Sequence, residues 1–268
     1  MEQMEHKYIT SSRGTVHYWI SRLQDATAKT IVFTHGLVAD HRMFEKQAVF
    51  FKDKCNVILW DVPLHGSSRP YTDFSYKNAA EELNSILLAE KIDRVILVGM
   101  SMGGYPSQMF GALYPQKTMG FIALDTTPFG TQYYSKLDRW WLMRVAPIAG
   151  LFPLSILKKS MAKSVSLTSF SYEMMTKMLA PLTKEMIVEQ MDLAYGGFLK
   201  ENFDVSFPFP VHILVGEKDK TGKVKQYCKK WSASAGYPLI IIKQAAHFSN
   251  GDNPERVNRE IFNFAKSL

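Results

Sequence analysis

Apolar residues along this chain form short unbroken runs separated by longer segments of helical periodicity. The runs are rich in β-branched and aromatic side chains, and several end at glycine, which predicts strands. Eight such runs occupy residues 8–12, 16–21, 30–36, 55–61, 94–99, 119–125, 211–216 and 238–243. The first two flank an Arg13-Gly14 turn, which predicts a hairpin. The later runs are apolar throughout, as in parallel strands buried on both faces.

The segments between these runs carry apolar residues at helical spacing. Residues 76–92 place four apolar side chains on one face, and residues 254–268 repeat that pattern in a closing helix. Helices are also predicted at residues 41–54, in the segment after Ser101, and in a lysine-rich segment around Cys228. Strand and helix alternate, which predicts an α/β fold with a mostly parallel, eight-stranded sheet and helices on both faces.

The alternation stops between residues 130 and 207, where helical segments rich in Met, Phe, Tyr and Trp follow one another. We therefore expect a core domain of residues 1–129 and 208–268, with a helical cap of residues 130–207 inserted after the sixth strand. The apolar stretch 140–157 contains Arg144, Pro147 and Pro153. That combination favours short helices broken at the prolines over a membrane-spanning helix.

Composition narrows the function classes. The 268 residues are 46% hydrophobic, enough for a substantial core. A net charge of +7 would suit a nucleic-acid partner, but the lysines are scattered and no nucleic-acid-binding motif accompanies them, so none is expected. Cys55 and Cys228 are predicted to be reduced thiols. The charged N-terminal segment lacks an apolar signal sequence, and both features predict a cytoplasmic location.

Chemistry-bearing residues follow the predicted strands. Ligands of such sheets lie at the carboxyl ends of the strands, and the residues there include a serine, three acids and two histidines: His35, Asp61, Ser101, Asp125, Asp219 and His247. Ser101 alone could be a helix N-cap. A serine nucleophile, however, needs a base and an acid that orients the base. The order Ser101, Asp219, His247 supplies all three.

Five motifs in order resemble the α/β-hydrolase family over nearly the whole chain. "GMSMGG" resembles the nucleophile elbow, in which a tight strand-to-helix turn exposes the serine. The other motifs are "HGLVADHRMF", "DVPLHGSS", "LVGEKDK" and "AAHFSNGDNPERVNREIFNF". They are similar to the oxyanion loop, the Asp-x-Pro-Gly-x-Gly-x-Ser turn, the acid turn and the histidine loop. Leu64 stands where the family usually has glycine.

The resemblance implies roles for individual residues. Ser101 would be the nucleophile and His247 the general base, oriented by Asp219. The backbone N–H groups of Leu37 and Met102 would bind the oxyanion, and neither a metal nor a cofactor would be needed. Asp125 is the alternative acid for the triad, because some family members carry their acid at the end of the strand that is predicted at residues 119–125.

The substrate would be a small-molecule ester held below the cap. The expected pocket residues are His35, Gly36, Asp125, Trp140, Trp141 and Phe248. The aromatic cap suits a medium-chain acyl or aromatic ester. Basic residues in its first part form either a solvated face or a weak contact with anionic lipid, without stable membrane insertion. Both a monomer and a homodimer fit the sequence.

The sequence therefore predicts a serine hydrolase that cleaves a carboxylic ester, thioester or lactone through an acyl-enzyme. Two alternatives stay open. The same triad serves carbon–carbon bond hydrolysis, lyase chemistry and perhydrolysis in other family members. A weakly hydrolytic ligand receptor on this fold is the other alternative, although such proteins often lose a triad residue and this sequence keeps all three.

Overall fold

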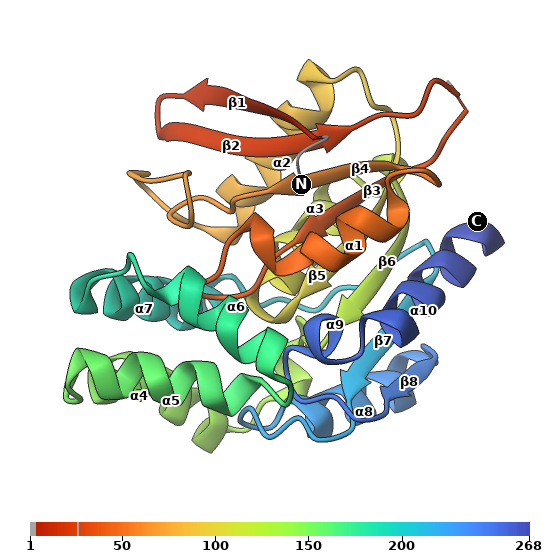
Figure 1. The fold of residues 1–268 in the computed structure, drawn as a ribbon. Coiled ribbons are helices and arrows are strands. Elements are labelled where there is room, and N and C mark those ends of the chain that lie inside the picture. Colours follow the sequence, from red (N-terminus) through yellow and green to blue (C-terminus); the bar gives the residue numbers. More distant parts are fainter. Residues whose placement is uncertain (1–3, 26) are drawn as a thin grey trace.

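A single eight-stranded sheet forms the centre of the molecule in this computed structural model, which describes residues 4–25 and 27–268 (Figure 1). Residues 1–3 and 26 of the predicted core domain lie outside the described residues. The strand order is β1-β2-β4-β3-β5-β6-β7-β8. The strands are β1 (Glu5–Ser11), β2 (Gly14–Ser21), β3 (Thr30–Thr34), β4 (Asn56–Trp60), β5 (Val95–Met100), β6 (Thr118–Leu124), β7 (Val211–Gly216) and β8 (Leu239–Ile242). All eight predicted strands are confirmed.

The sheet is parallel except at one edge. The hairpin of β1 and β2 pairs antiparallel, and β2 also runs antiparallel to β4. The six strands from β4 to β8 are parallel, and β3 and β5 are buried along their whole length because helices cover both faces. The pairing of Thr34 with Gly99 and of Met100 with Leu124 brings the carboxyl ends of β3, β5 and β6 together.

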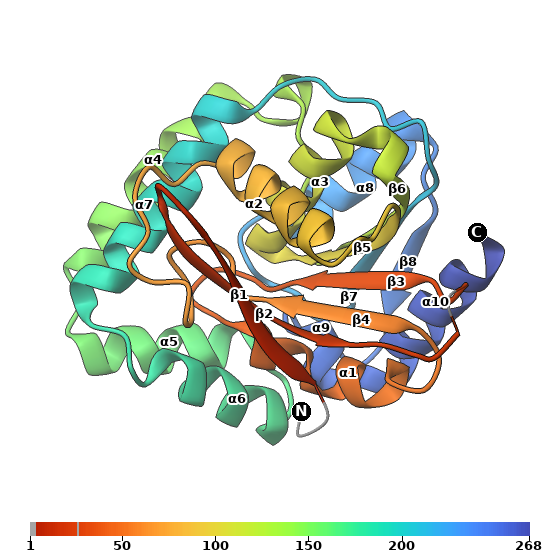
Figure 2. The same cartoon turned by 90° about the horizontal axis from the view of Figure 1, so that it is seen from above.

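Helices cover the sheet on both faces, as Figure 2 shows for α2 and α3 on one side and α1 and α10 on the other. The core helices are α1 (Glu45–Phe51), α2 (Tyr76–Ala89), α3 (Gly104–Leu113), α8 (Val224–Ala235), α9 (Ser249–Asp252) and α10 (Pro254–Ser267). Four 3-10 turns are η1 (His41–Phe44), η2 (Ser101–Gly103), η3 (Pro115–Lys117) and η4 (Thr131–Tyr133).

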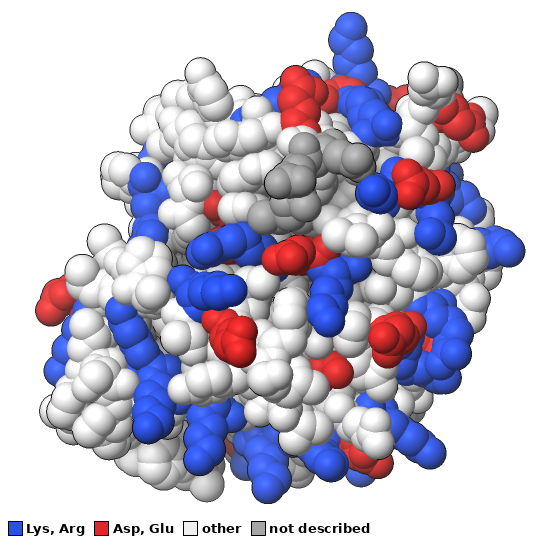
Figure 3. All heavy atoms as spheres, in the orientation of Figure 1, with Lys and Arg blue, Asp and Glu red and all other residues white. Residues whose placement is uncertain are grey.

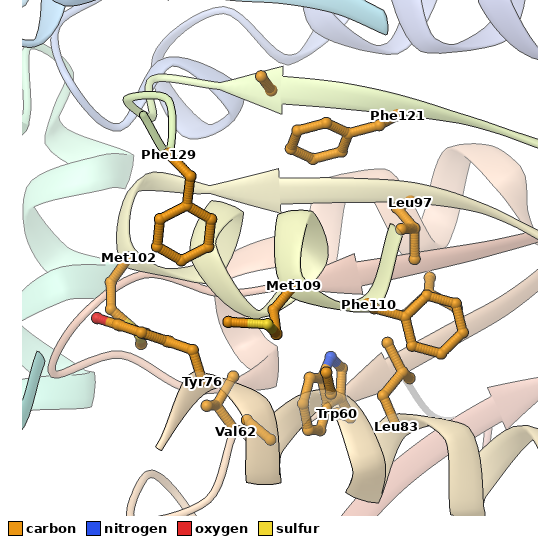
Figure 4. Packing of buried hydrophobic residues seen from close by; sticks show 14 of the residues in the cluster. Trp60, Val62, Tyr76, Leu83, Leu97, Met102, Met109, Phe110, Phe121 and Phe129 are labelled. Atoms are coloured by element: carbon orange, nitrogen blue, oxygen red, sulfur yellow. The ribbon is translucent and has the colours of Figure 1, made fainter. Parts of the chain in front are cut away.

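Two hydrophobic clusters, one on each face of the sheet, hold the helices in place. Figure 4 shows the first, in which Trp60 and Leu97 of the strands meet Leu83 of α2 and Phe110 of α3. These four side chains are fully buried. Each such side chain contributes about 1.5–3 kcal/mol relative to an exposed one. The cluster extends to Met102 at the start of η2, so the core also anchors the turn that carries Ser101.

Four consecutive helices separate β6 from β7, and we call them the insertion helices. They are α4 (Lys136–Gly150), α5 (Leu154–Val165), α6 (Ser169–Leu179) and α7 (Lys184–Glu201). Helix α4 packs against α7, and α5 packs against α6. None of the described helices is both long and apolar enough to cross a membrane.

One prediction about this segment is wrong in detail. Pro147 lies inside α4 and does not break it, whereas Pro153 is the N-cap of α5 and does separate the two helices. Pro147 lies on an exposed side of α4. Water can therefore hydrate the carbonyl that loses its helical hydrogen bond.

The two cysteines are free, as predicted. Cys55 follows the turn before β4 and Cys228 lies in α8, and both are buried. The Cys228 thiol donates a hydrogen bond to the carbonyl of Thr126, and burial raises its pKa far above the usual value. Both thiols are therefore poorly reactive parts of the core.

Candidate active site

Ser101 stands at the sharp turn between β5 and α3. Its φ angle is 52°, in the left-handed region that residues with a side chain rarely adopt. Two neighbouring glycines make the turn feasible. A Cβ atom at Gly103 would collide with the carbonyl oxygens of Thr34 and His35, and one at Gly99 would come within 2.7 Å of the Gly103 carbonyl. The small residues of "GMSMGG" thus let the turn pass directly against β3, and Ser101 remains partly exposed.

Ser101, His247 and Asp219 form one hydrogen-bonded chain. The Nε2 atom of His247 lies 2.8 Å from Ser101 Oγ, and its Nδ1 atom lies 2.8 Å from Asp219 Oδ2. Because the carboxylate can only accept, Nδ1 carries the proton and Nε2 is left to accept from the serine hydroxyl. The three residues follow the ends of β5, β7 and β8. The sheet therefore brings together the three residues that the sequence predicted to form the triad.

The acid of this chain is itself held in place. The second carboxylate oxygen of Asp219 accepts the backbone N–H of Thr221 at 2.7 Å. Burial raises the pKa of Asp219, but the hydrogen bond and charge of His247 together with the hydrogen bonds from Thr221 outweigh burial, and the net pKa lies below the usual value. Burial likewise lowers the pKa of His247, and the hydrogen bond and charge of Asp219 together with the charge of Asp125 more than reverse this, so the net pKa lies above the usual value. The carboxylate therefore stabilises an imidazolium at this position.

Asp125 lies close to this chain but binds other partners. It follows β6, and its carboxylate accepts the backbone N–H of Gly216 at 2.7 Å and the hydroxyl of Ser249. Complete burial raises its pKa to about 7. Its oxygens lie within 4.8 Å of the acid and base atoms of Asp219 and His247. Both ring nitrogens of His247 are already engaged by protein groups, which leaves none free for a metal ion.

The loop after β3 lies against Ser101. A Cβ atom at Gly36 would lie 3.0 Å from Met100 Sδ and 3.3 Å from Ser101 Cβ, so a side chain there would crowd both residues. His35 is fully buried, and its Nε2 accepts the N–H of Val62 at 3.0 Å. Its Nδ1–H therefore donates to the Gly36 carbonyl, 2.8 Å away. In a trans peptide the C=O and N–H groups point in opposite directions, so this bond also fixes the direction of the Leu37 N–H.

Met102 offers the second backbone donor. It is the second residue of η2, and N–H groups in the first turn of a helix have no partner within that helix. Its side chain is buried in the core, near Tyr76 and Phe129 in Figure 4. Packing of an apolar side chain therefore fixes the position of a polar backbone group.

An apolar cavity of about 220 Å³ opens beside Ser101. No Lys, Arg, Asp or Glu stands among its described lining residues, and Ser101, Ser164, Thr221 and His247 supply the polar groups. The other lining residues are Gly36, Leu37, Val38, Met43, Met100, Met161, Val165, Met175, Met191, Tyr195 and Phe248. The insertion helices α5, α6 and α7 provide several of them, so the insertion forms part of the cavity wall.

A second cavity of about 330 Å³ shares Val38 with the first but does not reach Ser101 or His247. Asp61 lies in its wall, where one carboxylate oxygen accepts the N–H and Nδ1 of His41 at 2.8 Å. Leu64, at the position where glycine is usual in the related motif, has a φ angle of 70°. The backbone thus keeps a glycine-like conformation although the side chain has changed.

The predicted pocket residues fall into three groups. Gly36 and Phe248 line the cavity, whereas His35 and Asp125 are buried behind it. Trp140 and Trp141 lie outside the cavity on α4, where they are 41% and 51% exposed. Three further lining residues, Met161, Ser164 and Val165 of α5, were not among the predicted pocket residues, although they have the i, i+3, i+4 spacing of one helix face.

Comparison with known proteins supports the same family. Residues 31–260 match the alpha/beta hydrolase family. A curated relative from Mesorhizobium japonicum, 2-(acetamidomethylene)succinate hydrolase, is 24% identical over 252 residues, which cover 87% of each chain.

Solved structures show the fold over the full length. A thermophilic esterase from Thermogutta terrifontis superimposes with a TM-score of 0.78 at 20% identity, covering 98% of both chains. The carboxylesterase CesB from Bacillus subtilis gives a TM-score of 0.76 at 17% identity, covering 99% of this chain and 92% of the other. Together with the match over residues 31–260, this shows that the chain belongs to the alpha/beta hydrolase family.

Proposed function

We propose that this hydrolase is a serine esterase, which cleaves a carboxylic ester of an apolar acyl or aromatic substrate through an acyl-enzyme. One observation carries the proposal: Ser101, His247 and Asp219 form a continuous hydrogen-bonded chain whose serine faces an apolar cavity. A serine without an adjacent base is a poor nucleophile. Here His247 lies within hydrogen-bonding distance of Ser101, and Asp219 lies within hydrogen-bonding distance of His247.

The reaction would proceed in two halves. Ser101 Oγ attacks the carbonyl carbon while His247 Nε2 takes its proton, and Asp219 stabilises the imidazolium. The N–H groups of Leu37 and Met102 would bind the oxyanion, each donor contributing about 3 kcal/mol. Collapse of the tetrahedral intermediate releases the alcohol, which His247 protonates. Water then enters, loses a proton to His247 and hydrolyses the acyl-serine. No step needs a metal or a cofactor.

The cavity suggests the acyl part of the substrate. Its wall offers no charged partner for a substrate carboxylate, so a neutral acyl group fits best. A volume of about 220 Å³ is small beside ordinary ligand pockets, which favours a short or medium acyl chain. Residues 130–207 would act as the cap over this cavity, because Met161, Met191 and Tyr195 of the insertion helices line it. The free, buried cysteines favour a reducing, cytoplasmic location.

A series of chromogenic esters from acetyl to palmitoyl tests the proposal. Ser101→Ala should lower kcat/KM by about 10⁴-fold or more, as loss of a triad nucleophile does. A fluorophosphonate should label the wild type and leave Ser101→Ala unlabelled. Ser85→Ala on the exposed side of α2 is the matched control and should keep full activity. Undiminished turnover by Ser101→Ala would rule out the serine mechanism. Tight ligand binding without turnover of any ester would instead favour a receptor.

A further inference from the structure

The outer side of α4 and α5 exposes an unusual amount of apolar surface. Half of the large apolar side chains that are exposed among the described residues lie between residues 137 and 156. We call this set the α4–α5 face. Its apolar members are Leu137, Trp140, Trp141, Met143, Ile148, Leu151, Phe152 and Ile156. Leu151 and Phe152, at the turn between the two helices, are 81% and 47% exposed. Exposed apolar side chains concentrated in one segment in this way mark an interaction site.

The same segment carries positive charge almost exclusively. Between residues 136 and 165 the chain has six basic residues and one acid. The acid, Asp138, is buried, where it caps α4 through Ser135 and forms an ion pair of 2.6 Å with Lys223. The basic residues are Lys136, Arg139, Arg144, Lys158, Lys159 and Lys163. Every charge of this segment that faces solvent is therefore positive.

The positive charge is a local property of these two helices. Helices α6 and α7 together carry five acids and three basic residues, so they have the opposite balance. Figure 2 shows α4 and α5 following one another along one side of the molecule. In Figure 3, Lys and Arg lie among uncharged atoms over the lower left region, where Figure 1 places α5.

Basic and aromatic residues are combined within the α4–α5 face. The Arg144 guanidinium lies 3.9 Å from the centre of the Trp140 ring, and the rings of Trp140 and Trp141 meet edge to face. Trp141, Arg144 and Ile148 recur at one-turn spacing along α4. Tryptophan prefers the boundary between lipid chains and headgroups, and arginine beside it can bind lipid phosphate.

We propose that the α4–α5 face docks on the surface of an anionic phospholipid bilayer. The apolar side chains, with Leu151 and Phe152 foremost, would enter the headgroup region, and the six cations would bind anionic headgroups. Charge complementarity favours lipid over a second copy of this chain. A two-fold contact through this face would place six cations opposite six others.

The docking site adjoins the catalytic cavity through α5. Met161 and Val165 line the cavity, while Ile156, Lys159 and Lys163 on the same helix are exposed. A bilayer seated on α5 would thus bring apolar esters to the helix that lines the cavity beside Ser101. This last step rests on the proposed esterase function, whereas the docking itself does not.

Vesicle binding by Ser101→Ala protein tests docking separately from catalysis. Vesicles of phosphatidylcholine with 30% phosphatidylserine should bind the protein at least tenfold more tightly than phosphatidylcholine alone, and 0.5 M salt should remove most of the difference. Lys159→Glu/Lys163→Glu should weaken binding at least tenfold. Lys229→Glu/Lys243→Glu, on the exposed side of α8 and after β8, makes the same change in net charge and should weaken it less than twofold.

The apolar contribution has its own pair of variants. Leu151→Asp/Phe152→Asp should abolish binding, whereas Leu88→Asp, at an exposed position of α2, should not. Lipids with brominated chains should quench tryptophan fluorescence, and Trp140→Phe/Trp141→Phe should remove that quenching. Of the other three tryptophans, Trp60 and Trp231 are buried, and Trp19 lies on β2 with its ring stacked on His41, outside the α4–α5 face. Equal binding to neutral and anionic vesicles, or no binding, would overturn the proposal. So would a dimer in solution that Leu151→Asp/Phe152→Asp converts to monomer.

Discussion

His35 holds the peptide group that follows it: its Nδ1 atom lies 2.8 Å from the carbonyl oxygen of Gly36. The other ring nitrogen accepts the N–H of Val62, so the tautomer is fixed and His35 must be neutral. Burial also lowers the pKa of His35. This histidine does not line the cavity beside Ser101, and in the proposed mechanism it would act by directing the Leu37 N–H.

Replacing His35 should therefore affect the chemical step more than binding. His35→Gln loses the donor at the Nδ1 position, so the Gly36 peptide can rotate and misdirect the Leu37 N–H. We expect kcat to fall about 10- to 100-fold, a part of the effect of losing one oxyanion donor, with KM within threefold of wild type. His35→Asn keeps a donor near Nδ1 and should recover part of kcat. Equal losses in both variants would indicate a general packing defect instead.

The two acids near His247 should differ sharply in their effects. Asp219→Asn removes the charge that stabilises the imidazolium and should lower kcat by about 10⁴-fold. Asp125→Asn keeps the Asp219 hydrogen bond and should stay within about tenfold of wild type. A loss with Asp125→Asn as large as that with Asp219→Asn would make Asp125 the triad acid.

The pH profile gives a second readout of this arrangement. Activity needs neutral His247, so kcat/KM should rise with pH through the pKa of His247, which lies above its usual value. The Asp125 carboxylate also raises the pKa of His247. Asp125→Asn should therefore move the rising limb to lower pH. Measuring kcat/KM between pH 5 and 9 for wild type and variant checks the direction, and a shift to higher pH would contradict it.

The fold and the hydrogen-bonded chain of Ser101, His247 and Asp219 could be predicted from the sequence because both depend on local patterns. Continuous apolar runs indicated parallel strands, and the residues after them had to meet at one sheet edge. The residues that line the cavity were harder to predict from the sequence. Trp140 and Trp141 were expected there, yet they face solvent, because α4 packs on α7 through other faces, and only tertiary packing decides which side of an insertion helix is inward.

Backbone conformation offers a test of stability far from the active site. Lys91 follows the end of α2 with a φ angle of 53°, and the N–H of Ile92 binds the Leu87 carbonyl, as in a Schellman motif. Glycine avoids the cost of this conformation, so Lys91→Gly should raise the free energy of unfolding by about 1 kcal/mol. Gly236 ends α8 with a φ angle of 72° and open space around it. Gly236→Ala should therefore lower the free energy of unfolding by about 1 kcal/mol.

Urea denaturation of both variants checks this pair. Activity should be unchanged in each, since neither residue lines the cavity beside Ser101. If Lys91→Gly proves less stable than wild type, the entropy gained by the unfolded chain outweighs the strain relieved in the folded one.

Methionines of the insertion helices should set the acyl length that the enzyme accepts. Met191 of α7 lines the cavity and is buried, so Met191→Ala should enlarge the cavity and move the preferred ester toward longer acyl chains. Loss of a buried methionine side chain costs about 2–5 kcal/mol of stability. The ratio of kcat/KM for octanoyl and butyryl esters is therefore the better measure. Both values are measured on the same protein sample, so a lower folded fraction reduces both equally and leaves their ratio unchanged.

We expect that ratio to rise at least fivefold in Met191→Ala. Met186→Ala is the matched control, because Met186 belongs to the same helix but is 36% exposed and does not line the cavity. Its ratio should stay within twofold of wild type. An unchanged ratio in Met191→Ala would mean that the acyl chain lies elsewhere, and the second cavity across Val38 would then be the place to probe with Leu182→Trp.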